Sequence, residues 1–210
     1  MGVKEETIFS RSGSKIITDD REIDILVRFE EPLIMVLGNV LSEEECIELI
    51  QLSKDRLNRS KIGTSHEIND TRTSSGAFLR EGENNLVGAI EKRVAQIMNV
   101  PLEHGESLHI LHYEVGQEYK PHFDFFSNES VTNNRISTLV IYLNDVESGG
   151  ATTFPKLNLS VYPRRGNAVY FEYFYNDSAL NDLTFHAGTP VMLGDKWIAT
   201  QWMRRQKYRE

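Results

Sequence analysis

The sequence predicts a mainly β domain with flanking α-helices, of the sandwich, barrel or jelly-roll type. Two segments in the first half have the apolar spacing of amphipathic helices, at about 43–57 and 84–98. From residue 106 onward, short segments rich in β-branched and aromatic residues follow one another, separated by turn sequences rather than helices. No linker divides the halves. We therefore expect one domain at 21–210, with helical support at about 43–100 and a β core at about 105–205.

The first elements follow from local signals. Residues 1–20 are polar and are expected to form a flexible arm, whereas residues 23–41 are rich in β-branched and large apolar side chains. Pro32 interrupts this second segment and indicates two short strands. Ser42 then precedes Glu45 at the spacing of a capping box, which predicts the start of the first helix.

A polar segment rich in Gly, Ser and Thr, at residues 58–75, predicts a long loop. Loops of this length in a compact domain are often functional or mobile. The second helix follows it and ends before Pro101. The strands expected after that point are 107–115, 135–143, 151–154, 159–162, 167–173, 184–186, 190–193 and 196–203.

Composition limits the classes of function. A chain of 210 residues with 40% hydrophobic and 26% charged residues is typical of a globular protein that buries a core. No apolar run approaches the roughly 20 residues that cross a bilayer, and the first residues lack the apolar core of a secretory signal. The single cysteine, Cys46, excludes an intrachain disulfide and a thiolate metal cluster, so we expect a cytoplasmic protein without a membrane partner. The formal net charge of −8 disfavours nucleic acid, whose phosphates bind mainly Lys and Arg.

The segment YKPHFDFF, at residues 119–126, has the aromatic content of a half-buried strand but also contains His122 and Asp124. Residues two apart on an extended chain point the same way, so this strand would present an imidazole and a carboxylate side by side. Taken alone, such a histidine is usually a packed or solvent-facing side chain, and His-x-Asp often arises by chance.

A third candidate residue, His186, lies far downstream in a short apolar strand context. Two imidazoles and one carboxylate form the facial triad of non-haem Fe(II) oxygenases, in which three ligands leave three positions open on the metal. His109 and His112 also lie in a predicted strand, but their odd spacing puts them on opposite faces, and we interpret them as structural. The pattern therefore predicts a metal site at His122, Asp124 and His186.

Longer blocks of sequence around these residues resemble the Fe(II)/2-oxoglutarate dioxygenases, and more closely the prolyl 4-hydroxylases of the collagen type. In order, the blocks are LHYEVGQEYKPHFDFF, RISTLVIYLNDVESGGATTFP, RRGNAVYFEY and HAGTPVMLGDKWIATQWMR. The resemblance runs from about residue 30 to the C-terminus, and RTSSGAFL at 72–79 resembles the family's substrate-side loop. These blocks are far more specific than the triad. They imply a double-stranded β-helix (jelly-roll) core.

The resemblance implies Fe(II) as cofactor and 2-oxoglutarate as co-substrate, with ascorbate as a candidate reductant. In the family, 2-oxoglutarate chelates iron through its 1-carboxylate and keto oxygen, and its other carboxylate requires a cation. Lys196, ten residues beyond His186, occupies that family position. Tyr113 and Thr152 match hydroxyl donors to the same carboxylate, although a small error of register would put Thr153 in place of Thr152.

The resemblance also implies a substrate side of the site. The residues that fall where the family holds the peptide and shapes the space above iron are Tyr119, Arg135, Trp202 and Arg204. Tyr119 could orient the target proline, and Trp202 offers a flat wall for a pyrrolidine ring, although a core tryptophan fits the sequence nearly as well. Some relatives have His where Arg204 stands. Arg72 would belong to a lid at 58–75 that closes on peptide, with an exposed loop arginine as the alternative.

Together these implications predict hydroxylation of peptidyl proline at C4, with O2 and 2-oxoglutarate consumed and 4-hydroxyproline, succinate and CO2 formed. The expected partner is a proline-rich or collagen-like peptide, because a polyproline II segment is already low in conformational entropy. Two alternatives stay open. One is a 2-oxoglutarate dioxygenase for a free amino acid or another small substrate, and the other is a non-catalytic jelly-roll binding protein. A homodimer, paired through the N-terminal strands and arm, is a further expectation.

Overall fold

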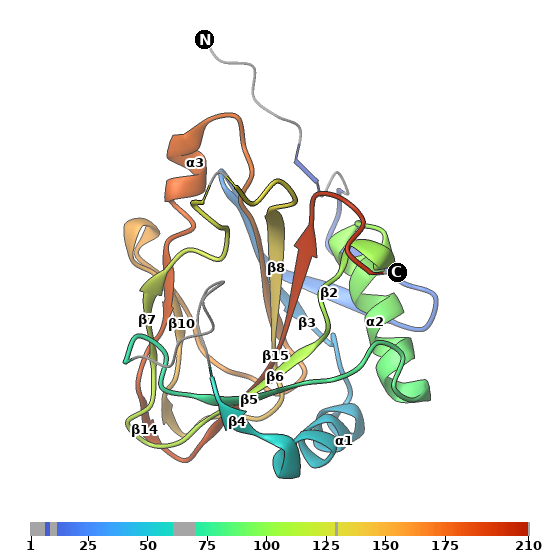
Figure 1. Cartoon of the computed structure of the whole chain (residues 1–210), viewed down its shortest axis with the longest axis vertical. Helices are drawn as coiled ribbons and strands as arrows, with labels where there is room; N and C mark the ends of the chain where they lie inside the picture. Colours follow the sequence, from blue (N-terminus) through green and yellow to red (C-terminus); the bar gives the residue numbers. More distant parts are fainter. Residues whose placement is uncertain (1–6, 9–11, 61–69, 129, 210) are drawn as a thin grey trace.

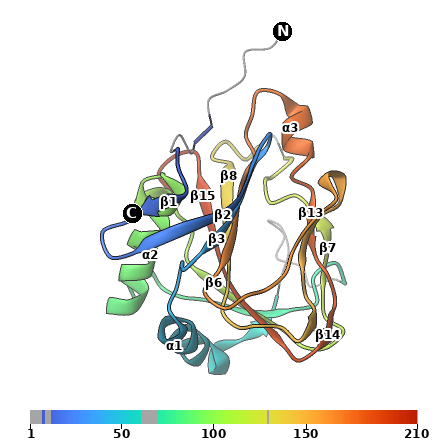
Figure 2. The same cartoon turned by 180° about the vertical axis from the view of Figure 1, so that it is seen from behind.

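Two β-sheets face each other in the computed structural model, and two helices cover the outer side of the larger sheet (Figures 1 and 2). The structure describes residues 7–8, 12–60, 70–128 and 130–209. Every strand pair in it is antiparallel. This arrangement is the predicted jelly roll with flanking helices.

The larger sheet has nine strands in the order β1 (Lys15–Ile17), β2 (Glu22–Glu30), β3 (Leu33–Gly38), β12 (Ala168–Glu172), β8 (Arg135–Tyr142), β15 (Lys196–Arg204), β6 (His109–Tyr113), β5 (Ser75–Phe78) and β4 (Asn58–Arg59). The smaller sheet has four strands in the order β11 (Leu159–Val161), β10 (Thr152–Phe154), β13 (His186–Gly188) and β7 (Tyr119–His122). A two-stranded pair joins β14 (Val191–Leu193) to β9 (Ser148–Gly149).

Alternate side chains of strand β8 belong to two different apolar clusters of the core. Leu139 and Ile141 belong to the apolar cluster that includes the helices, whereas Val140 and Tyr142 belong to the cluster between the sheets. Alternate side chains of a strand point to opposite faces. The larger sheet is therefore buried on both sides along β8. Its inner face, which is turned toward the smaller sheet, lines the site described below.

Helix α1 (Glu43–Ser53) begins at the predicted capping box. The Ser42 hydroxyl accepts the N–H of Glu45 at 3.2 Å, and the Glu45 carboxylate accepts the N–H of Ser42 at 2.8 Å. The helix predicted at about 43–57 ends earlier than expected, because residues Lys54–Arg56 form a 3₁₀ turn, η1.

Helix α2 (Asn85–Met98) confirms the prediction for 84–98. Asn84 caps it by accepting the N–H of Val87 at 2.8 Å, and Asn99 ends it in the left-handed conformation. From this helix the buried Arg93 pairs with Asp20 at 2.7 Å and with Glu45 at 2.6 Å. One guanidinium thus joins both helices to the N-terminal hairpin.

The N-terminal prediction needs a correction. Residues 15–17 of the predicted arm form β1, which pairs with β2, so this part of the arm belongs to the sheet. Residues 1–6 and 9–11 lie outside the described residues. Strand β1 forms one edge of the larger sheet. The homodimer expected through this region stays a prediction.

Other differences lie near the site. Strands β4 and β5 begin and end the segment predicted as a loop at 58–75, of which residues 61–69 are outside the described part. Strand β7 ends at His122, so Asp124 lies in the turn that follows and not on the strand. The short helix α3 (Ser178–Asp182) was not predicted, and the strand expected at 184–186 begins only at His186. The remaining strands expected after residue 106 are confirmed with shifted ends.

None of the helices in the described residues is both long and apolar enough to span a membrane. The predicted absence of a membrane partner stays a prediction.

Replacing Ser42 by Ala should lower the free energy of unfolding by about 1 kcal/mol, because the first turn of α1 loses an acceptor for its free N–H groups. Urea denaturation measures the change. Glu48→Gln, on the same helix but away from the cap, is the control and should stay within about 0.5 kcal/mol of the wild type. Equal losses in the two variants would contradict the capping role.

Candidate active site

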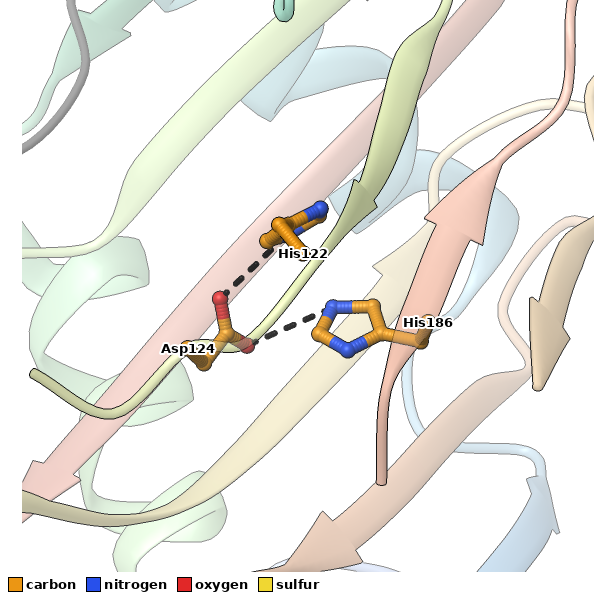
Figure 3. Close-up of side chains that lie close together, drawn as sticks. All are labelled: His122, Asp124 and His186. Carbon is orange, nitrogen blue, oxygen red and sulfur yellow. Dashed lines mark ion pairs between the residues drawn. The ribbon is translucent and has the colours of Figure 1, made fainter. Parts of the chain in front are cut away.

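The three predicted metal ligands meet at one point between the sheets. His122 and His186 are opposite each other in the pairing of β7 with β13, and Asp124 follows in the next turn. One ligand atom from each side chain lies within 4.8 Å of the others. Figure 3 shows the Asp124 carboxylate beside both rings, with one oxygen 3.6 Å from Nε2 of His122 and the other 3.6 Å from Nε2 of His186. This cluster could hold a metal ion.

Backbone carbonyls orient both imidazole rings. Nδ1 of His122 lies 2.8 Å from the carbonyl oxygen of Lys120, and Nδ1 of His186 lies 2.9 Å from that of Thr184. A carbonyl only accepts, so each Nδ1 carries a proton and donates it, and Nε2 is the ring atom that faces Asp124.

Burial and charge keep the ligands in the forms that bind a cation. Burial lowers the pKa of His186 to about 4, and the neighbouring His122 acts in the same direction. Burial alone would raise the pKa of Asp124, but the adjacent His186 and His122, together with Arg135, hold it well below its usual range. At neutral pH His186 is neutral and Asp124 is a carboxylate.

A chain of two hydroxyl groups supports the carboxylate from behind. Thr138 donates to Oδ2 of Asp124 at 2.7 Å and lies 2.7 Å from the Tyr173 hydroxyl. Because the Thr138 proton goes to the carboxylate, Tyr173 must donate to Thr138. Burial raises the pKa of Tyr173 well above its ordinary value, so this donor stays protonated. Neither residue carried a sequence signal that distinguished it from the core.

One cavity extends from the triad toward Lys196, which is 3% exposed. The side chains that line this end of the cavity with Lys196 include Tyr113 and Thr152. The ammonium nitrogen lies 5.4 Å from the centre of the Tyr113 ring, and burial lowers the pKa of Lys196 to about 7. The lysine is thus a buried cation whose charge is destabilised until an anion joins it.

The geometry also separates the two neighbouring threonines. Thr152 lines the cavity and accepts a hydrogen bond from the Tyr142 hydroxyl at 2.9 Å, which leaves its own proton free to donate. Thr153 is not among the lining residues. The structure therefore places Thr152, and not Thr153, beside Lys196.

Three of the predicted substrate residues also line the cavity, namely Tyr119, Trp202 and Arg72. Tyr119 stacks on His122 with ring centres 3.4 Å apart. Arg72 forms a β-bridge with Tyr119, holds its guanidinium 4.8 Å above that ring and is 5% exposed. The alternative of an exposed loop arginine is therefore wrong. Trp202 is buried with the core and also lines the cavity, so the two interpretations of this residue are not exclusive.

The other two predicted residues, Arg135 and Arg204, are not among those that line the cavity. Both are held by Glu106, which contacts Nε of Arg135 and Nε of Arg204 at 2.6 Å each. The Arg135 guanidinium also lies 3.9 Å from the centre of the Trp202 ring. Sequence reasoning missed Glu106, because a single glutamate in a loop gives no sign of its two partners.

The two remaining strand histidines differ in their surroundings. His112 bonds to Asp195 at 2.9 Å and stacks on Trp197 at 4.2 Å, on the helix side of the sheet, in agreement with a structural role. His109 lies on the opposite face, which Leu111 and Tyr113 share and where they line the cavity. Its ring centre is 5.7 Å from that of Trp202. The structure therefore places His109 beside the candidate site.

Comparisons with known proteins agree with this geometry. The family described as the 2OG-Fe(II) oxygenase superfamily matches residues 108–204. Probable prolyl 4-hydroxylase 3 of Arabidopsis thaliana is 40% identical over 205 residues, covering 85% of this chain and 71% of the relative. Probable prolyl 4-hydroxylase 10 of the same plant is 38% identical over 226 residues, covering 95% and 77%.

Among solved structures, the viral collagen prolyl hydroxylase from Paramecium Bursaria Chlorella virus-1, in its 2OG complex, superimposes with a TM-score of 0.68. The two chains are 28% identical, and the match covers 81% of this chain and 95% of the viral one.

Replacing His186 by Ala should weaken Co(II) binding by more than about 100-fold, since the site loses one of its three donors. Calorimetry, together with the visible absorption of the bound Co(II), measures this affinity. His104→Gln removes a histidine outside the cluster and should bind Co(II) like the wild type. Unchanged Co(II) affinity in the folded His186→Ala variant would show that the metal lies elsewhere.

Proposed function

The chain belongs to the prolyl 4-hydroxylase family of the 2OG-Fe(II) oxygenases, and on that basis we propose that it hydroxylates proline in a peptide at C4. One oxygen atom of O2 enters the new hydroxyl group and the other enters succinate, while 2-oxoglutarate loses CO2. The observation that carries the proposal is that one cavity is lined by a buried cation, the triad and an aromatic wall.

The donor set fits the family's cofactor. Imidazole nitrogens and a carboxylate oxygen on one face suit Fe(II), and three ligands leave room for exchangeable groups. His122, Asp124 and His186 would hold the metal. When bound with 2-oxoglutarate and O2, the iron supplies the oxidant for a C–H bond.

The Lys196 end of the cavity suits the distal carboxylate of 2-oxoglutarate. Lys196 would pair with the carboxylate, with Tyr113 and Thr152 as hydroxyl donors. A charge-assisted hydrogen bond of this kind contributes about 1.5–3 kcal/mol. The bound carboxylate would also stabilise the positive charge of Lys196, which burial disfavours.

The part of the cavity lined by Arg72 and Trp202 suits a peptide. Within the described residues, Nε of Arg72 and Nε1 of Trp202 are buried donors without a hydrogen-bond partner. A buried donor left unpaired costs about 1–3 kcal/mol, and the carbonyl groups of a bound peptide would remove this cost. Glu106 fixes Arg135 against the Trp202 ring, so that this wall is rigid before substrate arrives.

Aromatic rings restrict water around the metal ligands. Tyr119 covers the ring of His122, and the Phe171 ring lies edge-on to His186 with centres 4.7 Å apart. Exclusion of water protects the oxidant from side reactions and strengthens the electrostatic interactions inside the site.

The enzyme with Fe(II), 2-oxoglutarate and O2 should add one oxygen atom to proline in a (Pro-Pro-Gly)-type peptide and release one succinate for each. Peptide mass spectrometry locates the oxygen, and free proline under the same conditions is the comparison substrate. Absence of both peptide oxidation and peptide-stimulated succinate would contradict the proposal, and turnover of free proline alone would favour a small substrate.

The affinity for 2-oxoglutarate should fall as pH rises from about 7 to 9. The anion requires protonated Lys196, whose pKa in the free enzyme is about 7, so each binding event above this pH takes up a proton. Kd should rise by up to about tenfold per pH unit there and stay nearly constant between pH 6 and 6.5.

Anaerobic calorimetry in two buffers of different ionisation enthalpy measures both Kd and the proton uptake. Lys196→Met should bind 2-oxoglutarate weakly and without proton uptake. Proton uptake that persists in Lys196→Met would assign the titration to another group.

A further inference from the structure

A row of planar side chains continues beyond the cavity toward the edge of the larger sheet. The ring of Phe78, on β5, stacks on His109 with centres 3.9 Å apart and planes 11° from parallel. His109 lies 5.7 Å from Trp202, whose ring is covered by the Arg135 guanidinium. The row thus runs from a surface ring to a wall of the candidate site.

Exposure changes along this row. Trp202 and His109 are each 5% exposed, whereas Phe78 is 55% exposed. An exposed phenylalanine that is fixed by stacking on a buried ring presents apolar surface at little cost in side-chain entropy. Phe78 is the accessible end of a row of rings that begins at Trp202, and it is stacked on the middle ring, His109.

The local sequence makes room for the stack. A Cβ atom at Gly76 would lie 2.6 Å from Nε2 of His109, so any larger residue there would displace the ring. Burial, together with the positive charges of Arg72 and Arg135, holds the pKa of His109 well below its ordinary value. The ring is therefore neutral and stacks as an aromatic group.

The row of rings is at most about as long as one turn of extended peptide. Successive centre separations of 3.9 and 5.7 Å place Phe78 within about 10 Å of Trp202, and a polyproline II helix repeats every three residues at about 3.1 Å per residue. Residues three apart in such a peptide face the same way, about 9 Å from each other. Aromatic surfaces are the usual receptors for this conformation.

We propose that Phe78, backed by His109, forms a second subsite that takes a proline three positions from the target proline in the same peptide. The inference rests on the proposed function, since it assumes that the target residue lies against Trp202. The occupant is the substrate itself, because the stack is continuous with the cavity wall. Peptides with proline repeating every third residue would fill both subsites at once.

The test uses peptides of equal length and composition, each with one target proline and a second proline two, three or four residues before or after it. Kd is measured by calorimetry on the anaerobic enzyme with Fe(II) and 2-oxoglutarate, and kcat/KM is measured for each peptide in air. The wild type should prefer a spacing of three, on one side of the target, by about three- to tenfold. An aromatic contact is worth roughly this ratio.

In Phe78→Ala the ratio between spacing three and the other spacings should fall to about one, and Phe78→Tyr should retain it. Leu26→Ala removes a comparably exposed apolar side chain elsewhere and should leave the ratio unchanged. Equal ratios in the wild type and Phe78→Ala would overturn this inference and leave proline hydroxylation intact. Failure of the wild type to hydroxylate any of the peptides would instead overturn the proposed function, and this inference with it.

Discussion

The pairing of β7 with β13 that sets His186 opposite His122 is the constraint on which the site depends. In that register His122 and His186 are direct partners, so their rings meet on the inner face. A slip of one residue would turn either ring toward the other face, because side chains alternate along a strand. The nine-stranded sheet and its helices supply the rigid opposite wall, on which Thr138, Lys196 and Trp202 are fixed. The backbone hydrogen bonds that pair β7 with β13 therefore also bring the two histidines of the candidate metal site together.

The charge of the cavity is opposite to that of the protein. The chain carries a formal net charge of −8, yet two buried cations, Lys196 and Arg72, line the cavity together with one carboxylate, Asp124. A low-dielectric setting strengthens the electrostatic interactions that each of these charges makes. The excess of positive charge is suited to an anionic co-substrate and to peptide carbonyl groups. Glu106 holds Arg135 and Arg204, which do not line the cavity, and Arg135 packs against the Trp202 ring.

Much of this could be predicted from sequence because the signals were local or came as ordered blocks. The capping box at Ser42 needed only the spacing of two residues, and the triad became specific once the surrounding blocks accompanied it. Glu106 could not be predicted in the same way, since its partners come from β8 and the end of β15. The alternation of side chains along β6 put His109 and His112 on opposite faces of the strand, but it did not indicate which face held the site. Strand β1 lies in a polar segment without a local strand signal, and it forms by pairing with β2, so the sequence did not predict it.

The hydroxyl chain behind Asp124 has a consequence for the way this carboxylate would hold a metal. Thr138 donates to Oδ2 and Tyr173 donates to Thr138, so one of the two carboxylate oxygens is already engaged in a hydrogen bond. Attachment through the other oxygen alone would limit the protein to three bonds with an octahedral ion and would leave the other positions to a chelating keto acid and a diatomic gas. Two ordinary hydroxyl groups, ten or more residues from the ligands in the chain, would thus favour attachment of the carboxylate through a single oxygen.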